Sequence, residues 1–209
     1  TDPLPASQKL RVGIARTSEW DNAEPYMQGA VERAGALLEQ QGAQVSDVQL
    51  PILFEDIIPD FTTINGWEAS IMLADEIRDN LDSFNDLNAD RVEQTKALSE
   101  GDYRAAGERL DAARNAMDEQ FADYDVFISP SLPGEAPVGL TESRPGGFAR
   151  LWTQMYTPAV NLPLFTGPND MPVCFQVVGR RNSDDATLAA AAWVDARLRH
   201  ALGEVPAAS

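Results

Sequence analysis

Residues 10–50 read LRVGIARTSEWDNAEPYMQGAVERAGALLEQQGAQVSDVQL, and this stretch decides the fold class. Apolar side chains alternate over residues 10–15, which is typical of a strand. Residues 44–50 show a second strand pattern. Between the two strands, apolar residues recur at the three-and-four spacing of one helical face: Met27, Ala30, Val31, Ala34, Leu37 and Leu38. A helix between two strands predicts a parallel strand, helix, strand unit.

The ends of this first helix also carry local signals. Asp21 and Asn22 are residue types that cap helix N-termini, so we expect the helix to start close to them. Gly42 follows the last apolar residue of the helical pattern, and we expect it to end the helix in a left-handed conformation.

The rest of the chain alternates in the same way between helical and extended patterns. Long helices are predicted around residues 64–81 and after Asp102, with a short one at 92–98. Strands are predicted at 125–129, 159–164 and 172–178, and Ser183 is expected to cap a last helix. A segment rich in proline and glycine, residues 131–147, predicts a loop, and a short helix is expected through 148–156.

These elements predict an α/β fold, a mixed β-sheet flanked by helices on both sides. We expect residues 1–9 to be a loose N-terminal segment, residues 10–203 to form a single domain and residues 204–209 to be a tail. The chain has 209 residues, enough for one buried core.

Composition excludes several function classes. Acidic residues outnumber basic ones 33 to 16, a net charge of −17, so we expect no nucleic-acid partner and no anionic membrane partner. No apolar run reaches the length of about 18 residues that a spanning helix needs.

Cys174 is the lone cysteine and His200 the lone histidine, so we expect no intramolecular disulfide, no metal site and no cofactor. We expect a cytoplasmic protein. Because Thr1 is not an initiator methionine, we also expect that the chain has lost an upstream part or was cut from a larger one.

No complete catalytic group can be assembled from these residues. His200 lies at the end of the last helix. A favourable interaction of its charge with the helix C-terminus explains its presence there better than a role in a serine triad does. The other common base for a serine is lysine, and only Lys9 and Lys96 are present. Ser129 and Ser131 follow a predicted strand, but neither lies in a Gly-x-Ser-x-Gly turn. Thr1 could act as an N-terminal nucleophile, but an ordinary chain terminus explains it better. Cys174 could be a reactive thiol, but a small buried residue in a strand explains it better.

The order of segments resembles the C-terminal part of the amidase signature family. The pieces are LRVGIAR, AVERAGALLEQQGAQV, DYRAAGERLDAARNAMDEQFADYDVFISPSLPGEAPVG, FARLWTQMYTPAVNLPLF and MPVCFQVVGRRNSDDATLAAAAWV. Gln176 and Gly179 match the last strand of the family, whereas Cys174 replaces its usual glycine. The Gly/Ser-rich segment that carries two serines and a lysine in this family is absent from the sequence.

The resemblance implies part of an α/β/α sandwich in an enzyme that cleaves carboxylic amides. Catalytic residues would belong to a complementary N-terminal amidase half, in the same precursor or in a partner chain. This chain would then supply the wall that surrounds the acyl group of a small-molecule amide. The lining residues implied are Trp67, Ser131, Trp152 and Tyr156. Core packing would explain Trp67 equally well, and Trp152 and Tyr156, four residues apart, could instead pack together.

Two other hypotheses remain open from the sequence. One is a non-catalytic binding or structural subunit that keeps the amidase-like fold. The other interprets the excess of Asp and Glu as adaptation to high salt.

Overall fold

The computed structural model describes residues 4–5, 7–51, 54, 57–84, 86–139 and 147–203. It divides into two compact units, one made of Thr1–Pro51 and Ala116–Ser209 and the other of Ile52–Asn115. The prediction that residues 10–203 form a single domain stays a prediction. The predicted tail, residues 204–209, lies outside the described residues, as do four residues of the predicted N-terminal segment.

The first unit is built on a five-stranded sheet in the order β2-β1-β3-β5-β4. The strands are β1 (Arg11–Ala15), β2 (Gln44–Val48), β3 (Val126–Pro130), β4 (Ala159–Thr166) and β5 (Pro172–Val178). Strand β1 runs parallel to β2 and to β3, whereas β5 runs antiparallel to β3 and to β4. The mixed sheet and the parallel unit over residues 10–50 are therefore confirmed.

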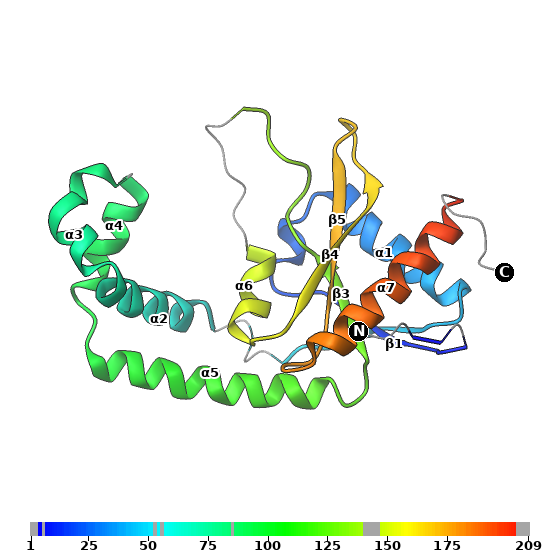
Figure 1. Ribbon diagram of the computed structural model, residues 1–209, viewed down its shortest axis with the longest axis horizontal. Coiled ribbons are helices and arrows are strands. Elements are labelled where there is room, and N and C mark those ends of the chain that lie inside the picture. The colour runs from blue at the N-terminus through cyan, green and yellow to red at the C-terminus, as the bar shows by residue number, and fades with distance from the viewer. Residues whose placement is uncertain are drawn as a thin grey trace. The chain divides into compact units, whose positions relative to one another are not determined.

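Helices cover both faces of this sheet (Figure 1). They are α1 (Pro25–Gln40), α6 (Gly147–Gln154) and α7 (Asp184–Ala201), and the short 3-10 helix η1 (Trp20–Asn22) precedes α1. Helices α1 and α7 pack on one face through a core of Val12, Ile14, Val31, Leu38, Val126, Ile128, Phe175, Val177, Trp193, Val194 and Leu198. Fully burying one such side chain contributes about 1.5–3 kcal/mol.

The residues that alternate along β3 with those of the first core face α6. Because successive side chains of a strand point to opposite faces, Phe127 and Ser129 lie on the other side from Val126 and Ile128. The Phe127 ring stacks on Phe121 at 4.1 Å between ring centroids, and its centroid lies 6.1 Å from that of the Trp152 ring. The α6 face therefore carries an aromatic layer beside the buried Ser129 hydroxyl.

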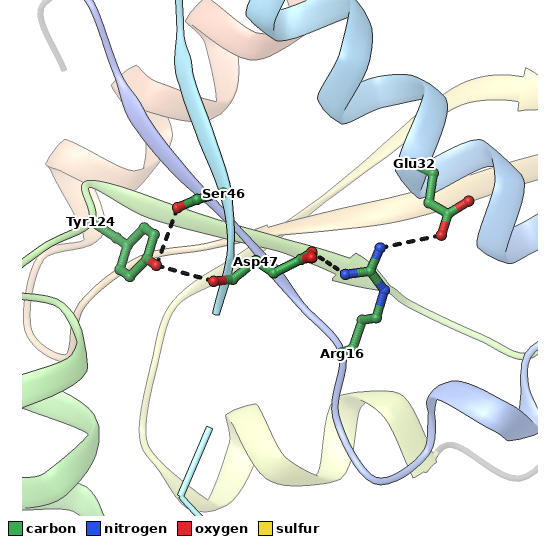
Figure 2. A network of polar contacts seen from close by, with 5 residues as sticks. All are labelled: Arg16, Glu32, Ser46, Asp47 and Tyr124. Carbon is green, nitrogen blue, oxygen red and sulfur yellow. Dashed lines mark hydrogen bonds and ion pairs between the residues drawn. The ribbon is translucent and has the colours of Figure 1, made fainter. Parts of the chain in front are cut away.

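A polar network ties the first strand–helix–strand unit together (Figure 2). Arg16, just after β1, forms ion pairs with Glu32 of α1 and Asp47 of β2. The hydroxyl of Tyr124 accepts a hydrogen bond from Ser46 at 3.2 Å and donates to the Asp47 carbonyl at 3.3 Å. The Tyr124 ring lies close to β1 at Gly13, where an added Cβ would be 3.0 Å from it.

The second unit is helical. Its elements are α2 (Ile57–Met72), α3 (Ala74–Asn80), the 3-10 helix η3 (Leu81–Ser83), α4 (Asp86–Thr95) and the first part of α5 (Glu100–Gln120). Asp60 is buried in α2 and accepts hydrogen bonds from the guanidinium of Arg109, at 3.0 Å from Nε. These hydrogen bonds and the charge of Asp60 raise the pKa of Arg109 above its ordinary value.

Several helix boundaries differ from the sequence expectation, and among them α4 spans Asp86–Thr95 where a short helix was predicted at 92–98. Helix α1 begins at Pro25, a favoured first helical residue, whereas Asp21 and Asn22 lie in η1 and cap nothing there. The helix predicted around 64–81 begins earlier, at Ile57, and is divided at Leu73 into α2 and α3, of which α3 buries no residue. Helix α5 begins at Glu100 rather than after Asp102.

The start of α5 is a reciprocal cap. The Asp102 carboxylate accepts hydrogen bonds from the backbone N–H and hydroxyl of Ser99, while the Ser99 hydroxyl accepts one from the Asp102 N–H. These bonds lower the pKa of Asp102 from its ordinary 3.8. At the other helix termini, Gly42 has the predicted left-handed φ of 94°, and Ser183 makes no capping hydrogen bond.

Candidate functional site at the end of β3

Strand β3 ends at Pro130 and delivers the proline- and glycine-rich loop whose residues 131–139 are described. Ser131 opens the loop. Its hydroxyl donates a 2.9 Å hydrogen bond to the carbonyl of Cys174 in β5, so it fastens the loop to the neighbouring strand. Cys174 is half-buried rather than fully buried as expected.

A buried polar cluster lies directly beneath the start of this loop. Ser129, fully buried, accepts hydrogen bonds at 3.2 Å from the indole Nε1 of Trp152 and at 3.2 Å from Nε2 of Gln176. The Gln176 amide also donates to the carbonyls of Pro130 at 2.8 Å and Phe148 at 3.2 Å. Because buried polar groups are stable only when paired, this cluster fixes the places of the strand end and of α6.

Trp152 and Tyr156 occupy different environments. Trp152 is 1% exposed and its ring is part of the core, whereas Tyr156 is 62% exposed. Helix α6 ends at Gln154, two residues before Tyr156 and short of the predicted 148–156, in keeping with Pro158, which disfavours helical geometry in the residue before it. The structure therefore does not place the two residues on one face of a continuous helix.

Tyr156 adopts a backbone conformation that usually belongs to glycine. Its φ is 55°, in the left-handed region. Its N–H bonds to the Thr153 carbonyl at 3.2 Å, and the N–H of Thr157 bonds to the Trp152 carbonyl at 3.1 Å. This pair of bonds is the Schellman helix end, in which glycine normally takes the position of Tyr156. A tyrosine here costs conformational energy, and such strain clusters at functional sites.

The loop is held at a second point by Glu135, which is 3% exposed. Its carboxylate accepts hydrogen bonds from the backbone N–H of Asn169 at 3.0 Å and of Met171 at 3.2 Å, in the turn between β4 and β5. Its own N–H donates to the Tyr26 hydroxyl at 2.8 Å. Hydrogen bonds at Ser131 and Glu135 therefore hold the loop at both ends of residues 131–135.

Trp67 belongs to the second unit. It is half-buried in α2 and stacks on Tyr103 of α5, with ring centroids 5.9 Å apart and an interplanar angle of 26°. The Tyr103 hydroxyl donates to Glu68 at 3.0 Å. Ser131, Trp152 and Tyr156 all belong to the first unit.

Neither lysine is placed to activate a serine. Lys9 is exposed, and Lys96 forms an ion pair with Glu93 at 2.5 Å with its side chain 60% exposed. Within the described ranges, no group of three or more His, Cys, Asp or Glu side chains is placed to hold a metal ion. No helix in that same part of the chain is long and apolar enough to cross a membrane.

A protein-family model described as amidase matches residues 3–188. The chain belongs to the amidase family. It is 27% identical to 2-amino-5-chloromuconic acid deaminase of Comamonas testosteroni, over 98% of this chain and 48% of that protein. It is also 27% identical to a glutamyl-tRNA(Gln) amidotransferase subunit of Brevibacillus brevis, over 86% of this chain and 43% of that protein.

Solved structures agree on the fold. A crystal structure of an amidase superposes with a TM-score of 0.78 at 24% identity, covering 91% of this chain and 46% of the other. The chain spans about half the length of the curated relatives it matches. The amidase family and the mixed-sheet α/β fold predicted from the sequence are thus confirmed.

Two residues of the site in this amidase-family chain were not predicted from the sequence. Glu135 is the one charged residue in the segment SLPGEAPVG over residues 131–139, which is a usable signal. Gln176 was predicted only to match the last strand of the family. Its side-chain nitrogen has three acceptors within hydrogen-bond distance, which share its two N–H groups, and no local pattern brings those acceptors together.

Proposed function

We propose that this chain is the C-terminal part of an amide hydrolase and forms the wall of its acyl pocket. A complementary half, joined covalently or as a partner chain, supplies the two serines and the lysine. The serine of that half attacks the amide carbonyl, the amine leaves with a proton, and water then releases the acyl group as a carboxylic acid. Family membership supports the reaction class, and the division of labour is our inference.

One observation carries the division of labour. A serine nucleophile needs a base within hydrogen-bond reach, and lysine is the base in the family that this chain resembles. Lys9 is exposed, and Lys96 is ion-paired on an exposed surface. The buried Ser129 receives its hydrogen bonds from an indole and an amide, and neither group accepts a proton. The base must then come from elsewhere.

The first unit offers material for a pocket wall. The loop from Ser131 is fastened at Glu135, α6 presents Trp152 beneath it, and Tyr156 is exposed at the end of the same helix. Aromatic walls favour apolar or aryl acyl groups and exclude water while the oxyanion forms. Trp67 remains a proposed lining residue from the second unit.

The names of several relatives support a partner. They describe a subunit of glutamyl-tRNA(Gln) amidotransferase, that is, one chain of an assembly. We propose by analogy that this chain also acts within an assembly, on a small carboxylic amide. A cytoplasmic location remains part of the proposal.

The direct test combines this chain with an N-terminal amidase half that carries the two serines and the lysine. Release of ammonia or amine from alkyl and aryl amides is measured for each polypeptide and for the pair. We expect turnover from the pair and none from either part. Turnover by this chain alone that survives repurification would refute the division of labour, and an inactive pair would refute the proposed amide hydrolysis.

A non-catalytic subunit makes a different prediction in size-exclusion chromatography. A stable binding module should elute alone as one monodisperse species. A half-enzyme should expose an apolar surface and associate until its partner is added. A monodisperse chain that is unchanged by the other half would favour the binding module.

A further inference from the structure

We propose that Gln176 is a positioning residue that sets the shape of the acyl pocket without touching the substrate. This inference rests on the proposed function. Gln176 lies in β5 and is 4% exposed, and its side-chain nitrogen already faces three acceptors of this chain, so we place it behind the pocket wall. Its effect is exerted through the segments to which it donates hydrogen bonds.

The amide of Gln176 joins the segments that carry three proposed lining residues. One acceptor is the Pro130 carbonyl at 2.8 Å, one residue before Ser131. Another is the Phe148 carbonyl at 3.2 Å, in the first turn of the helix that carries Trp152 and leads to Tyr156. A single side chain thus joins the start of the loop to α6.

Ser129 closes the cluster. Its hydroxyl oxygen accepts from both Gln176 and the Trp152 indole, at 3.2 Å each. Two carbonyl acceptors identify the Gln176 atom that faces them as the amide nitrogen. Since an oxygen there would face other oxygens, an ionised Gln176→Glu side chain loses every donated hydrogen bond at almost constant shape, and a protonated one keeps a single donor.

Displacement of the loop or of α6 should alter which acyl groups fit. A shift of about 1 Å in substrate-positioning groups can change rates by about 100-fold. We therefore expect substitutions of Gln176 to change the ratio of kcat/KM between a short alkyl amide and an aryl amide by at least about threefold. A purely structural residue would lower both values together.

The experiment uses the full chain paired with a catalytic amidase half. Gln176→Glu and Gln176→Met are compared with Gln28→Glu, because the Gln28 amide also donates to a backbone carbonyl, that of Trp20 at 2.9 Å, outside the cluster. The indole N–H resonance of Trp152, assigned with Trp152→Phe, reports the cluster directly. We expect both Gln176 variants to shift this resonance and to change the acyl-selectivity ratio. Gln28→Glu should leave the resonance unshifted and the selectivity ratio within about twofold of the wild type.

If the Gln176 variants do not fold, Ser129→Ala serves in their place, because it removes the shared acceptor and leaves the two carbonyl bonds. It should move the indole resonance and shift the selectivity ratio. An active wild-type pair whose selectivity is unchanged by these variants overturns the positioning role alone. An inactive wild-type pair overturns the amidase proposal, and the positioning role falls with it.

Discussion

Glu135 and Asn169 are joined by hydrogen bonds from both the backbone and the side chain of Asn169. The Glu135 carboxylate accepts from Asn169 N at 3.0 Å and from Asn169 Nδ2 at 2.7 Å. At Gly167 an added Cβ would lie 2.3 Å from the Glu135 Oε1. The β4–β5 turn is therefore built around a buried carboxylate that belongs to the loop after β3.

Glu135→Gln should destabilise the protein by about 1–3 kcal/mol, because the new amide would point a donor at backbone N–H groups. Urea unfolding measures the loss, and hydrogen exchange should accelerate at Asn169 and Met171. Glu39→Gln, on an exposed position of α1, is the control and should change stability by less than about 0.5 kcal/mol. Equal effects of the two variants would show that the turn does not depend on Glu135.

Two glycine-to-alanine substitutions should have opposite signs. A Cβ at Gly13 would lie 2.2 Å from Val48 Cγ2 and 2.8 Å from the Phe127 ring, so Gly13→Ala should cost about 1–3 kcal/mol. Gly29 is in α1 with nothing within 4 Å of an added Cβ, so Gly29→Ala should stabilise by up to about 1 kcal/mol. Thermal unfolding measures both. A neutral Gly13→Ala would mean that β1 and its neighbours can separate freely.

Tyr156→Gly should separate stability from function. In the folded state, glycine removes the strain of the left-handed φ of 55°, which costs other residues about 1–2 kcal/mol. In the unfolded state, glycine raises the conformational entropy, which offsets part of this gain. We expect the free energy of unfolding to stay level or rise by up to about 1 kcal/mol, while kcat/KM of the assembled enzyme falls. Asn182→Gly, also at a positive φ, is the control and should leave activity unchanged. If Tyr156→Gly keeps full activity, the proposal that Tyr156 lines the pocket is wrong.

The reciprocal cap of α5 predicts a stability loss and a pH dependence. Ser99→Ala should cost about 0.5–2 kcal/mol, whereas Ser183→Ala, at a helix start without a capping bond, should cost less. The folded-state pKa of Asp102 lies below its ordinary 3.8. Its stabilising effect is therefore present above about pH 4 and is lost as the pH falls through the folded-state pKa.

Asp102→Asn tests this pH dependence. Chemical unfolding from pH 6 to pH 3 should show a shallower fall in stability for this variant than for the wild type. Identical slopes would mean that other carboxylates account for the acid response of the protein.

Local patterns in the sequence determined much of the fold. Alternation over β1 and the helical stripe of α1 predicted the parallel unit, and Gly42 predicted its helix end. A long helix after Asp102 was also predicted, and α5 buries Ala106, Leu110, Ala113 and Met117 along its length. These features depend on neighbours within about one or two helical turns, so periodicity reveals them.

The tertiary structure alone decided how the candidate site is held. Ser129 meets Trp152 and Gln176 from 23 and 47 residues away, and Glu135 meets Asn169 from 34 residues away. It also decided that Trp152 is core while Tyr156 is exposed in a strained helix end. Hydrogen bonds between buried groups depend on the distance and direction between atoms that only the packed sheet brings together, and no spacing along the chain encodes those distances.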